Sequence, residues 1–202
     1  MEKTNIFSIG HGQKTAEEFI SELQSFGIQF LIDVRTSPFS KWATHFNQDL
    51  IETLLSKYQI RYVYMGDKIG GRPLNDECYD EAGFFDYEKM AQVQEFKEGL
   101  ARLVTAKTNG CIVAIMCSES DPTQCHRSKL IGRELYFNHD IDIQHIIAPN
   151  KVKSEMQILI ELTKGDWRPE GGLGLWSCEP PYFKSRKAYK NEEELEEFDY
   201  YA

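Results

Sequence analysis

The sequence lacks several features that would assign it to a specialised class of protein. No apolar run approaches the roughly 20 residues needed to cross a bilayer, so we expect no membrane partner. No basic-then-apolar leader opens the chain, which favours a cytoplasmic location. A basic excess is also missing, because 23 Lys and Arg stand against 32 Asp and Glu. This balance argues against a general binder of phosphate backbones.

Two common kinds of cysteine chemistry are absent as well. The five cysteines are odd in number and irregular in spacing, unlike the dense, even set of a small secreted scaffold, so we expect reduced thiols. No pair has the Cys-x-x-Cys spacing of a thioredoxin-like motif or of a closed zinc site. Glycine-rich dinucleotide and Walker loops are missing too, since residues 10–15 read Gly-His-Gly-Gln-Lys-Thr.

What the chain does contain is a regular alternation of short apolar runs and helical stretches. Of its 202 residues, 41% are hydrophobic, which suits one α/β domain with appendages. The pattern predicts five strands, each followed by a helix, at 6–9, 28–34, 60–65, 111–117 and 141–147. We therefore expect a three-layer α/β fold with a mainly parallel sheet of about five strands.

Capping residues predict where several helices begin. Thr15 and Glu18 form a capping box before the first helix, and Ser154 is placed to cap the last one. Asp121 is a good N-cap and is followed by proline, which suits the first helical position. This pattern predicts a helix over 122–137.

Two acidic segments account for the net charge of -9. Residues 67–88 hold seven acids and two bases, and residues 191–202 hold six acids and no base. The first segment is predicted to be a solvated flap, and the second ends a C-terminal arm at 166–202. The α/β domain would then span 1–165. The rest of the chain carries a net charge of +2, which permits a focused anion pocket.

Polar residues follow the predicted strands at their carboxyl ends, the edge at which parallel α/β sheets bind ligands. His11 stands between two glycines, where it can act as a general acid or base or cap a turn. Asp33 and Arg35 share one face of the second strand. They either orient a base and hold an anion or form an internal ion pair. Gly70 and Gly71 open a turn whose amides can cradle an anion.

The densest group of reactive side chains surrounds the start of the predicted fourth helix. Cys125, His126 and Arg127 fall in or just beyond its first turn, where free amides and the helix dipole favour an anion or a thiolate. Arg127 adds a donor for phosphate or carboxylate. Glu119 precedes them. The alternative is that Cys117 and Cys125 pack in the core while Arg127 pairs with an acid.

Taken in order, these motifs resemble the signature of a known family. They are Ser8-Ile9-Gly10-His11, Asp33-Val34-Arg35 with Pro38 and Ser40, Gly70-Gly71-Arg72-Pro73, and Met116-Cys117-Ser118-Glu119 through Pro122 to Cys125-His126-Arg127. Over residues 4–165 the chain resembles the bacterial family known as domain of unknown function 488. The resemblance implies a Rossmann-like α/β fold and a shared polar pocket, but no agreed reaction. Relatives more often carry Gly-His-Ser in the first motif, where Gly12 stands here.

The leading functional hypothesis is an enzyme acting on a small anionic ligand, such as a nucleotide or another phosphate-bearing metabolite. Its anion-binding groups would be Arg35, Arg127, the turn at Gly70 and Gly71, and the helix amides at 122–125. An imidazole would transfer protons, a carboxylate would orient it, and a thiol would act as nucleophile. These catalytic groups are His11, Asp33, Glu119, Cys125 and His126.

Two other functions are compatible with the same residues. In the first, Cys117, Cys125, His126 and His11 bind iron or zinc, and Tyr182 and Tyr189 complete an iron site. In the second, the chain is a non-catalytic adaptor in nucleic-acid processing, as suggested by the aromatic and basic loop at 39–46 and the basic run at 184–187. That run is otherwise a solvated strip. The sequence names no cofactor.

Overall fold

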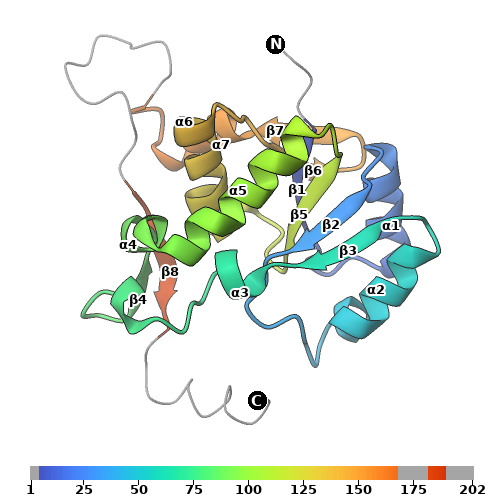
Figure 1. Ribbon diagram of the computed structural model, residues 1–202, viewed down its shortest axis with the longest axis horizontal. Coiled ribbons are helices and arrows are strands. Elements are labelled where there is room, and N and C mark those ends of the chain that lie inside the picture. Colours follow the sequence, from blue (N-terminus) through green and yellow to red (C-terminus); the bar gives the residue numbers. More distant parts are fainter. Residues whose placement is uncertain (1–4, 168–181, 190–202) are drawn as a thin grey trace.

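In the computed structural model, which describes residues 5–167 and 182–189, a six-stranded sheet lies between two layers of helices (Figure 1). The strand order is β3-β2-β5-β1-β6-β7. These strands are β1 (Ile6–Gly10), β2 (Phe30–Asp33), β3 (Arg61–Tyr64), β5 (Val113–Cys117), β6 (Gln144–Ala148) and β7 (Lys151–Ser154). The first five are parallel, and β7 pairs antiparallel with β6. The predicted fold class is confirmed, with β7 as an additional edge strand.

The order in which the strands are connected explains the two helical layers. The crossovers from β1 to β3 contain α1 (Ala16–Ser25) and α2 (Gln48–Ser56), which cover one face of the sheet. The chain then reverses direction, so α5 (Gln94–Thr108) and α6 (Arg133–His139) cover the other face (Figure 1). A further helix, α7 (Glu155–Leu162), follows β7.

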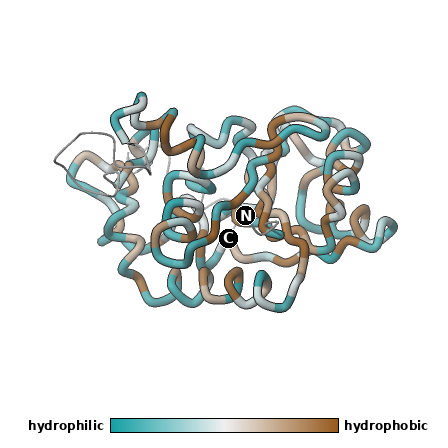
Figure 2. Tube along the Cα trace, turned by 90° about the horizontal axis from the view of Figure 1, so that it is seen from above, coloured by the Kyte–Doolittle hydropathy of each residue, from teal (hydrophilic) through white to brown (hydrophobic). Residues whose placement is uncertain are grey.

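Each helical layer buries its own apolar core against the sheet. Phe19 of α1 and Leu55 of α2 join Leu31 of β2 in one core, whereas Leu100 of α5 joins Ile115 of β5 in the other. Figure 2 shows hydrophilic and hydrophobic residues interspersed along the outer helices, as expected for helices with one buried face. The sheet is therefore rigid on both sides, which fixes the loops at its carboxyl edge.

The predicted caps of the first and last helices are confirmed. The Thr15 side chain accepts a hydrogen bond from the Glu18 backbone, and the Glu18 carboxylate accepts one from the Thr15 backbone. Ser154 and Gln157 form the same reciprocal pair at the start of α7. Both caps satisfy backbone donors that the helix itself leaves unpaired.

The predicted helix over 122–137 is wrong in its first turn. Asp121 caps only a short 3₁₀ turn, η3 (Pro122–Gln124), after which Cys125 has extended backbone with φ −120° and ψ 146°. The chain then continues through a π-helical segment, η4 (Arg127–Gly132), into α6. The break allows the Cys125 thiol to accept hydrogen bonds from the backbone and side chain of Arg127. This contact between Cys125 and Arg127 accompanies the break that the capping signal does not predict.

The predicted solvated flap at 67–88 is also partly wrong. Its segments are α3 (Gly66–Ile69), η2 (Asp76–Cys78), β4 (Phe84–Asp86) and the start of α4 (Tyr87–Gln92). Acids such as Glu77 and Glu81 are exposed, but Cys78, Phe85 and Tyr87 are buried in the core. The segment is therefore an anchored extension of the domain with an acidic outer surface.

Part of the C-terminal arm packs against this extension. β8 (Lys184–Ala188) pairs antiparallel with β4, and the Tyr189 backbone N–H donates to the Gly83 carbonyl. The acidic end at 191–202 and the part of the arm at 168–181 lie outside the described residues. Within the described ranges, no helix is both long and apolar enough to cross a membrane.

Candidate functional site

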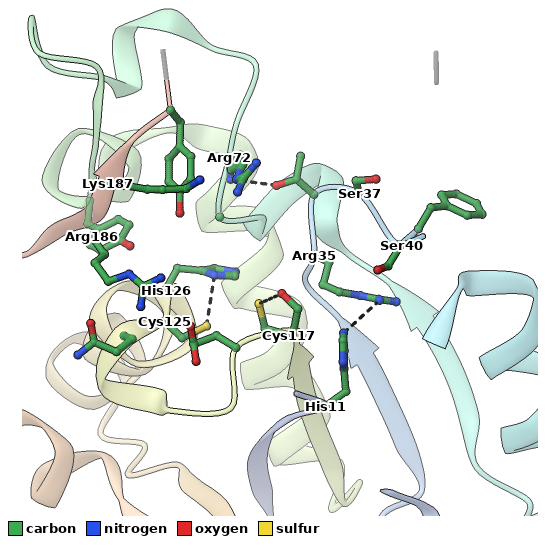
Figure 3. Close-up of a pocket in the computed structure, with 18 residues that line it drawn as sticks. His11, Arg35, Ser37, Ser40, Arg72, Cys117, Cys125, His126, Arg186 and Lys187 are labelled. Carbon is green, nitrogen blue, oxygen red and sulfur yellow. Dashed lines mark hydrogen bonds between the residues drawn. The ribbon is translucent and has the colours of Figure 1, made fainter. Parts of the chain in front are cut away.

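A cavity of about 550 Å³ opens at the carboxyl ends of β1, β2 and β5 (Figure 3). His11 reaches it from β1, Arg35 from β2, and Cys117 from the end of β5. Residues of β8 close another side. The volume falls within the range of roughly 300–1,000 Å³ typical of small-molecule sites. The pocket therefore occupies the sheet edge that the sequence predicted.

The lining of this cavity is strongly cationic, although the whole chain is acidic. Its cations are Arg35, Arg72, Arg186 and Lys187, and Glu119 is the single acid among the described lining residues. Sequence reasoning missed Arg72, Arg186 and Lys187 as site residues. The basic run at 184–187 was visible, but its pairing with β4 brings residues about 100 positions apart together and leaves no local signal.

Two close contacts between segments require glycine at the site. A Cβ on Gly10 would collide with the backbone carbonyl of Glu119, so glycine lets β1 approach the loop after β5. A Cβ on Gly71 would lie 2.7 Å from the His126 Nδ1. Gly71 therefore makes room for the imidazole and lines the cavity. Gly70 packs against the Gly66 carbonyl instead.

Cys125 is the most unusual ionisable group of the pocket. Its Sγ accepts hydrogen bonds from Arg127 Nε at 3.3 Å and from the Arg127 backbone N–H, with N and Sγ 3.5 Å apart. It also faces the His126 Nδ1 at 3.6 Å. Burial alone would raise the thiol pKa, but the hydrogen bond from Cys117 and the Arg127 guanidinium lower the Cys125 pKa to about 6. The thiolate is therefore the main form at neutral pH.

Arg127 is fully buried behind this thiolate rather than exposed to the cavity. Its Nη1 donates to Ser8 Oγ at 3.1 Å, and its Nη2 donates to the Glu119 carbonyl. No carboxylate of the described residues accepts a hydrogen bond from it. An arginine remains charged in a protein, so the Cys125 thiolate is its nearest counter-charge.

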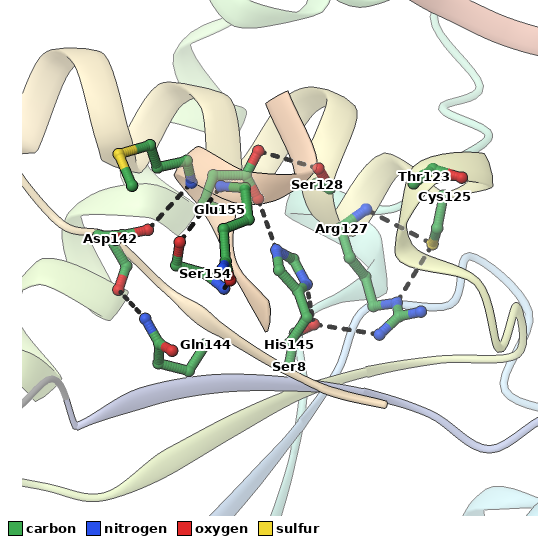
Figure 4. Close-up of polar contacts among 12 residues, drawn as sticks. Ser8, Thr123, Cys125, Arg127, Ser128, Asp142, Gln144, His145, Ser154 and Glu155 are labelled. Atoms are coloured by element: carbon green, nitrogen blue, oxygen red, sulfur yellow. Dashed lines mark hydrogen bonds and ion pairs between the residues drawn. The ribbon is translucent and has the colours of Figure 1, made fainter. Parts of the chain in front are cut away.

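A buried polar chain continues from Arg127 into the protein (Figure 4). Ser8 Oγ lies 2.6 Å from His145 Nδ1, and His145 Nε2 lies 2.6 Å from Glu155 Oε2. Burial lowers the pKa of His145 to about 3 and raises that of Glu155 well above its usual range. The neutral Glu155 carboxyl therefore donates its proton in a hydrogen bond to the neutral His145 imidazole, and the pair carries no net charge. The Ser128 hydroxyl donates to the other Glu155 oxygen.

His11 and Asp33 do not form the predicted pair of imidazole and orienting carboxylate. Asp33 instead binds the Arg35 guanidinium with both oxygens and accepts a hydrogen bond from Tyr62. The His11 ring stacks on Phe46 at 4.3 Å, and its Nδ1 donates to the Gly12 carbonyl. Burial and the nearby Arg35 lower the pKa of His11 to about 4, so this imidazole is neutral at physiological pH.

His126 is oriented by the backbone. Its Nε2 donates to the Val34 carbonyl at 3.2 Å, which directs Nδ1 towards the Cys125 sulfur. Glu119 does not contact either imidazole of the pocket, and its carboxylate accepts a hydrogen bond from the Asp121 backbone.

The free amides predicted at 122–125 are not available to a ligand. Backbone N–H groups of Thr123, Gln124 and Cys125 already donate to Asp121 or Pro122. The anion site predicted from these amides is therefore wrong. Side-chain cations, rather than a helix terminus, provide the positive charge of the pocket.

The predicted metal ligands come together only in part. Cys117, Cys125 and His126 offer three ligand atoms within 4.8 Å of one another, and His11 is outside this group. Tyr189 lines the cavity. Tyr182 is engaged elsewhere, because the Arg133 guanidinium lies 3.6 Å from the centre of its ring.

The aromatic loop at 39–46 has three different environments. Phe46 is buried beneath His11, as expected for a residue that closes the sheet edge. Phe39 lines the cavity and remains 61% exposed, and Trp42 is 96% exposed. Of this loop, the Phe39 ring is therefore the one that is accessible within the pocket.

Comparison with known proteins gives one match. The family described as domain of unknown function DUF488 matches residues 15–133, more than half of the chain. This stretch contains the motifs at Asp33, Gly71 and Cys125, and His11 lies just before it. Searches of curated proteins and of solved structures found no match. The chemistry of the site must therefore be inferred from its own residues.

Proposed function

The chain belongs to the DUF488 family, and we propose that it is an enzyme that binds a small phosphate-bearing anion and attacks it with the Cys125 thiolate. One observation carries this proposal. A thiol with a pKa of about 6 lies at the floor of a cavity lined by Arg72, Arg186 and Lys187 and by Arg35, which is ion-paired with Asp33. The cations would bind and orient the substrate, and the thiolate would be the nucleophile.

Two of the cationic groups come from segments fixed by the fold. The Arg35 guanidinium is ion-paired with Asp33, and Asp33 and the Phe46 carbonyl occupy its Nε and Nη2, so Nη1, 3.5 Å from His11 Nε2, is its remaining donor for a ligand. The Arg72 backbone N–H donates to Thr36, and its guanidinium lies over the Tyr189 ring at 4.2 Å. Fixed donors favour phosphate binding because little conformational entropy is lost when the ligand arrives.

A nucleoside phosphate suits the rest of the cavity. The accessible Phe39 ring provides a face on which a nucleobase can stack. The phosphate of the ligand would lie among the cationic side chains. The cavity volume is large enough for the nucleobase and the phosphate together. The ligand class is therefore a small anion with a flat aromatic group.

The proposed reaction begins with the sulfur. The thiolate forms a bond to an electrophilic phosphorus or carbon atom of the substrate, and the leaving group departs with its electron pair. His126 Nδ1, at 3.6 Å from Sγ, is the group placed to take the thiol proton when Cys125 is protonated. Neutral His11 would accept a hydrogen bond, and Glu119 is the acid available within the cavity.

Thermal unfolding with phosphorylated compounds tests the proposal. Orthophosphate, pyrophosphate and nucleoside monophosphates and diphosphates should raise the melting temperature by an amount that grows with the logarithm of ligand concentration above Kd. Mass spectrometry should then detect a covalent adduct on Cys125 with the reactive members of the panel. If no phosphorylated compound raises the melting temperature and no adduct forms on Cys125, the proposal is contradicted.

Metal binding is a second candidate, favoured by the cluster of Cys117, Cys125 and His126. Two thiolates and one imidazole suit zinc, and the cavity would leave a fourth position open. The Val34 carbonyl orients His126 as outer groups orient metal-ligating histidines. Elemental analysis after growth with added zinc or iron should give one ion per chain, and Cys117→Ser should reduce that value. A metal content near zero would remove this candidate.

A further inference from the structure

Two cysteine sulfurs lie together at the floor of the cavity. Cys117 ends β5, and Cys125 follows the η3 turn, so the fold brings them together from different segments. Their Sγ atoms are within 4.8 Å of each other, and both residues line the cavity. Figure 3 shows the two residues side by side, below Arg72, Arg186 and Lys187.

The two sulfurs differ in their surroundings. Cys125 Sγ accepts hydrogen bonds from Arg127 Nε at 3.3 Å and from the Arg127 backbone N–H, whereas Cys117 Sγ lies 4.0 Å from the Ser118 hydroxyl. A sulfur activated by a guanidinium beside a second thiol is the arrangement in which one sulfur is oxidised first and the other then attacks it.

The other described cysteines lack these properties. Cys78 is buried away from the cavity, its thiol donates to Met90 Sδ at 3.7 Å, and burial raises its pKa. Cys111 precedes β5, at the end of the strand opposite to Cys117. These two residues provide internal controls within the same chain.

We propose that Cys117 and Cys125 form a site of reversible oxidation, in which a hydroperoxide converts the pair to an internal disulfide. The proposal rests on the nucleophilic Cys125 of the proposed function and adds a resolving role for Cys117. It also defines a second class of reactant for the pocket, a small peroxide.

The chemistry balances in two steps. The Cys125 thiolate attacks one peroxide oxygen, so an S–O bond forms, the O–O bond breaks and an alkoxide or hydroxide leaves with the electron pair. The sulfur is now a sulfenic acid, oxidised by two electrons, and the peroxide is reduced. The Cys117 sulfur then attacks the Cys125 sulfur, an S–S bond replaces the S–O bond, and the Cys117 proton leaves with the hydroxyl as water.

The two sulfurs are close enough that a small shift would join them. A disulfide needs an S–S distance of about 2.05 Å, so the sulfurs must approach each other by no more than a few ångströms. Cys117 is fixed in a strand buried along its whole length. Cys125 is in the extended break between η3 and η4, and its segment is the one that would move.

The disulfide should be easy to reduce. Oxidation removes the thiolate and leaves the buried Arg127 guanidinium without its nearest counter-charge. The reduced state is therefore favoured, as it is in oxidoreductases with a stabilised thiolate. Millimolar glutathione should restore both thiols.

The test is intact-mass analysis of the full chain after reduction, chelation and graded treatment with hydrogen peroxide. We expect the mass of the chain to fall by that of two hydrogens and peptide mapping to find a disulfide between residues 117 and 125. Glutathione should reverse both changes fully. In Cys117→Ser the sulfenic acid of Cys125 should persist and react with dimedone, and no internal disulfide should form. In Cys125→Ser, Cys117 should stay reduced. Cys111→Ser should form the disulfide as the unmodified chain does.

Two results would overturn the proposal. One is the absence of a disulfide between residues 117 and 125 while Cys125 is oxidised to higher acids. The other is oxidation of Cys117 in Cys125→Ser at the same peroxide dose that oxidises the pair in the unmodified chain. Phosphate binding is measured independently, by thermal unfolding. The cationic side chains of the cavity are still present in Cys125→Ser. Failure of the disulfide and failure of anion binding are therefore distinguishable.

Discussion

The guanidinium Nε of Arg127 lies 3.3 Å from the sulfur of Cys125, and both groups are buried. The other nitrogens of this guanidinium donate to Ser8 Oγ and to the Glu119 carbonyl, which are neutral acceptors. The pair therefore behaves as one unit, in which a permanent cation stabilises a thiolate beneath the pocket. This unit distinguishes the site from a simple anion-binding cleft.

Arg127→Lys should raise the pKa of Cys125, because lysine keeps the charge but lacks the planar arrangement of donors. A hydrogen bond to a charged group contributes about 1.5–3 kcal/mol, so alkylation of Cys125 at pH 6 should slow by about tenfold or more. Arg133→Lys is the matched control, since Arg133 is equally buried but pairs with Glu134 outside the pocket. Equal alkylation rates in both variants would show that Arg127 does not hold the thiolate.

The stability of the fold should rise with pH between about 6.5 and 8.5. The Cys125 pKa is about 6 in the folded chain and about 8.5 when unfolded, so between these values the unfolded chain binds more protons. This stabilisation is complete above the unfolded pKa and is lost as the pH falls through the folded one. His11 and His145 give a slope of the same sign below about 6.5, whereas Glu155, whose pKa is raised by burial, gives a slope of the opposite sign above its ordinary pKa.

Urea unfolding at a series of pH values measures this dependence. Cys125→Ser should reduce the slope between about pH 6.5 and 8.5 and leave the acid limb, which His11, His145 and Glu155 shape together, unchanged. Equal slopes for the unmodified chain and Cys125→Ser in this window would contradict the lowered pKa of Cys125.

Removing the cations of β8 should abolish anion binding. In the double variant with Arg186→Ala and Lys187→Ala, we expect the phosphate-induced rise in melting temperature to disappear, corresponding to an affinity loss of at least about tenfold. Lys184→Ala is the matched control on the same strand, because Lys184 pairs with Asp80 outside the cavity. If both variants bind phosphate as the unmodified chain does, β8 does not contribute to the site.

Gly71→Ala should displace the His126 imidazole, since the added Cβ would lie 2.7 Å from its Nδ1. Overpacking of this kind costs about 1–3 kcal/mol of unfolding free energy. Combining it with His126→Ala should recover much of the loss, because the truncated side chain leaves room for the Cβ. Purely additive effects in the double variant would show that the two residues do not collide.

Much of the fold could be predicted because its signals are local. The buried strand at 113–117 is apolar throughout, and the Thr15 and Glu18 capping box depends on a spacing of three residues. β7 was missed because Lys151–Ser154 is short, polar and at the sheet edge, where no apolar pattern is required. The segment 67–88 is highly charged, so its apolar residues Cys78, Phe85 and Tyr87 gave no clear signal that one side of it is buried.

The candidate site could be located but not assembled from the sequence. Its sheet edge follows from the strand order of parallel α/β folds, and His11, Arg35 and Cys125 line one cavity at that edge. The arrangement of Cys125 against Arg127 depends on a break in the helix that local capping rules do not contain. The cations of β8 depend on pairing with β4, which is a long-range contact.

Titration of Cys125 is the most direct test of the central claim that Arg127 holds a thiolate under the cationic pocket. Thiolate absorbance in the ultraviolet, recorded against pH and corrected with Cys125→Ser, isolates this residue. We predict a transition with a midpoint near pH 6. A midpoint near the ordinary cysteine value of about 8.5 would contradict the account.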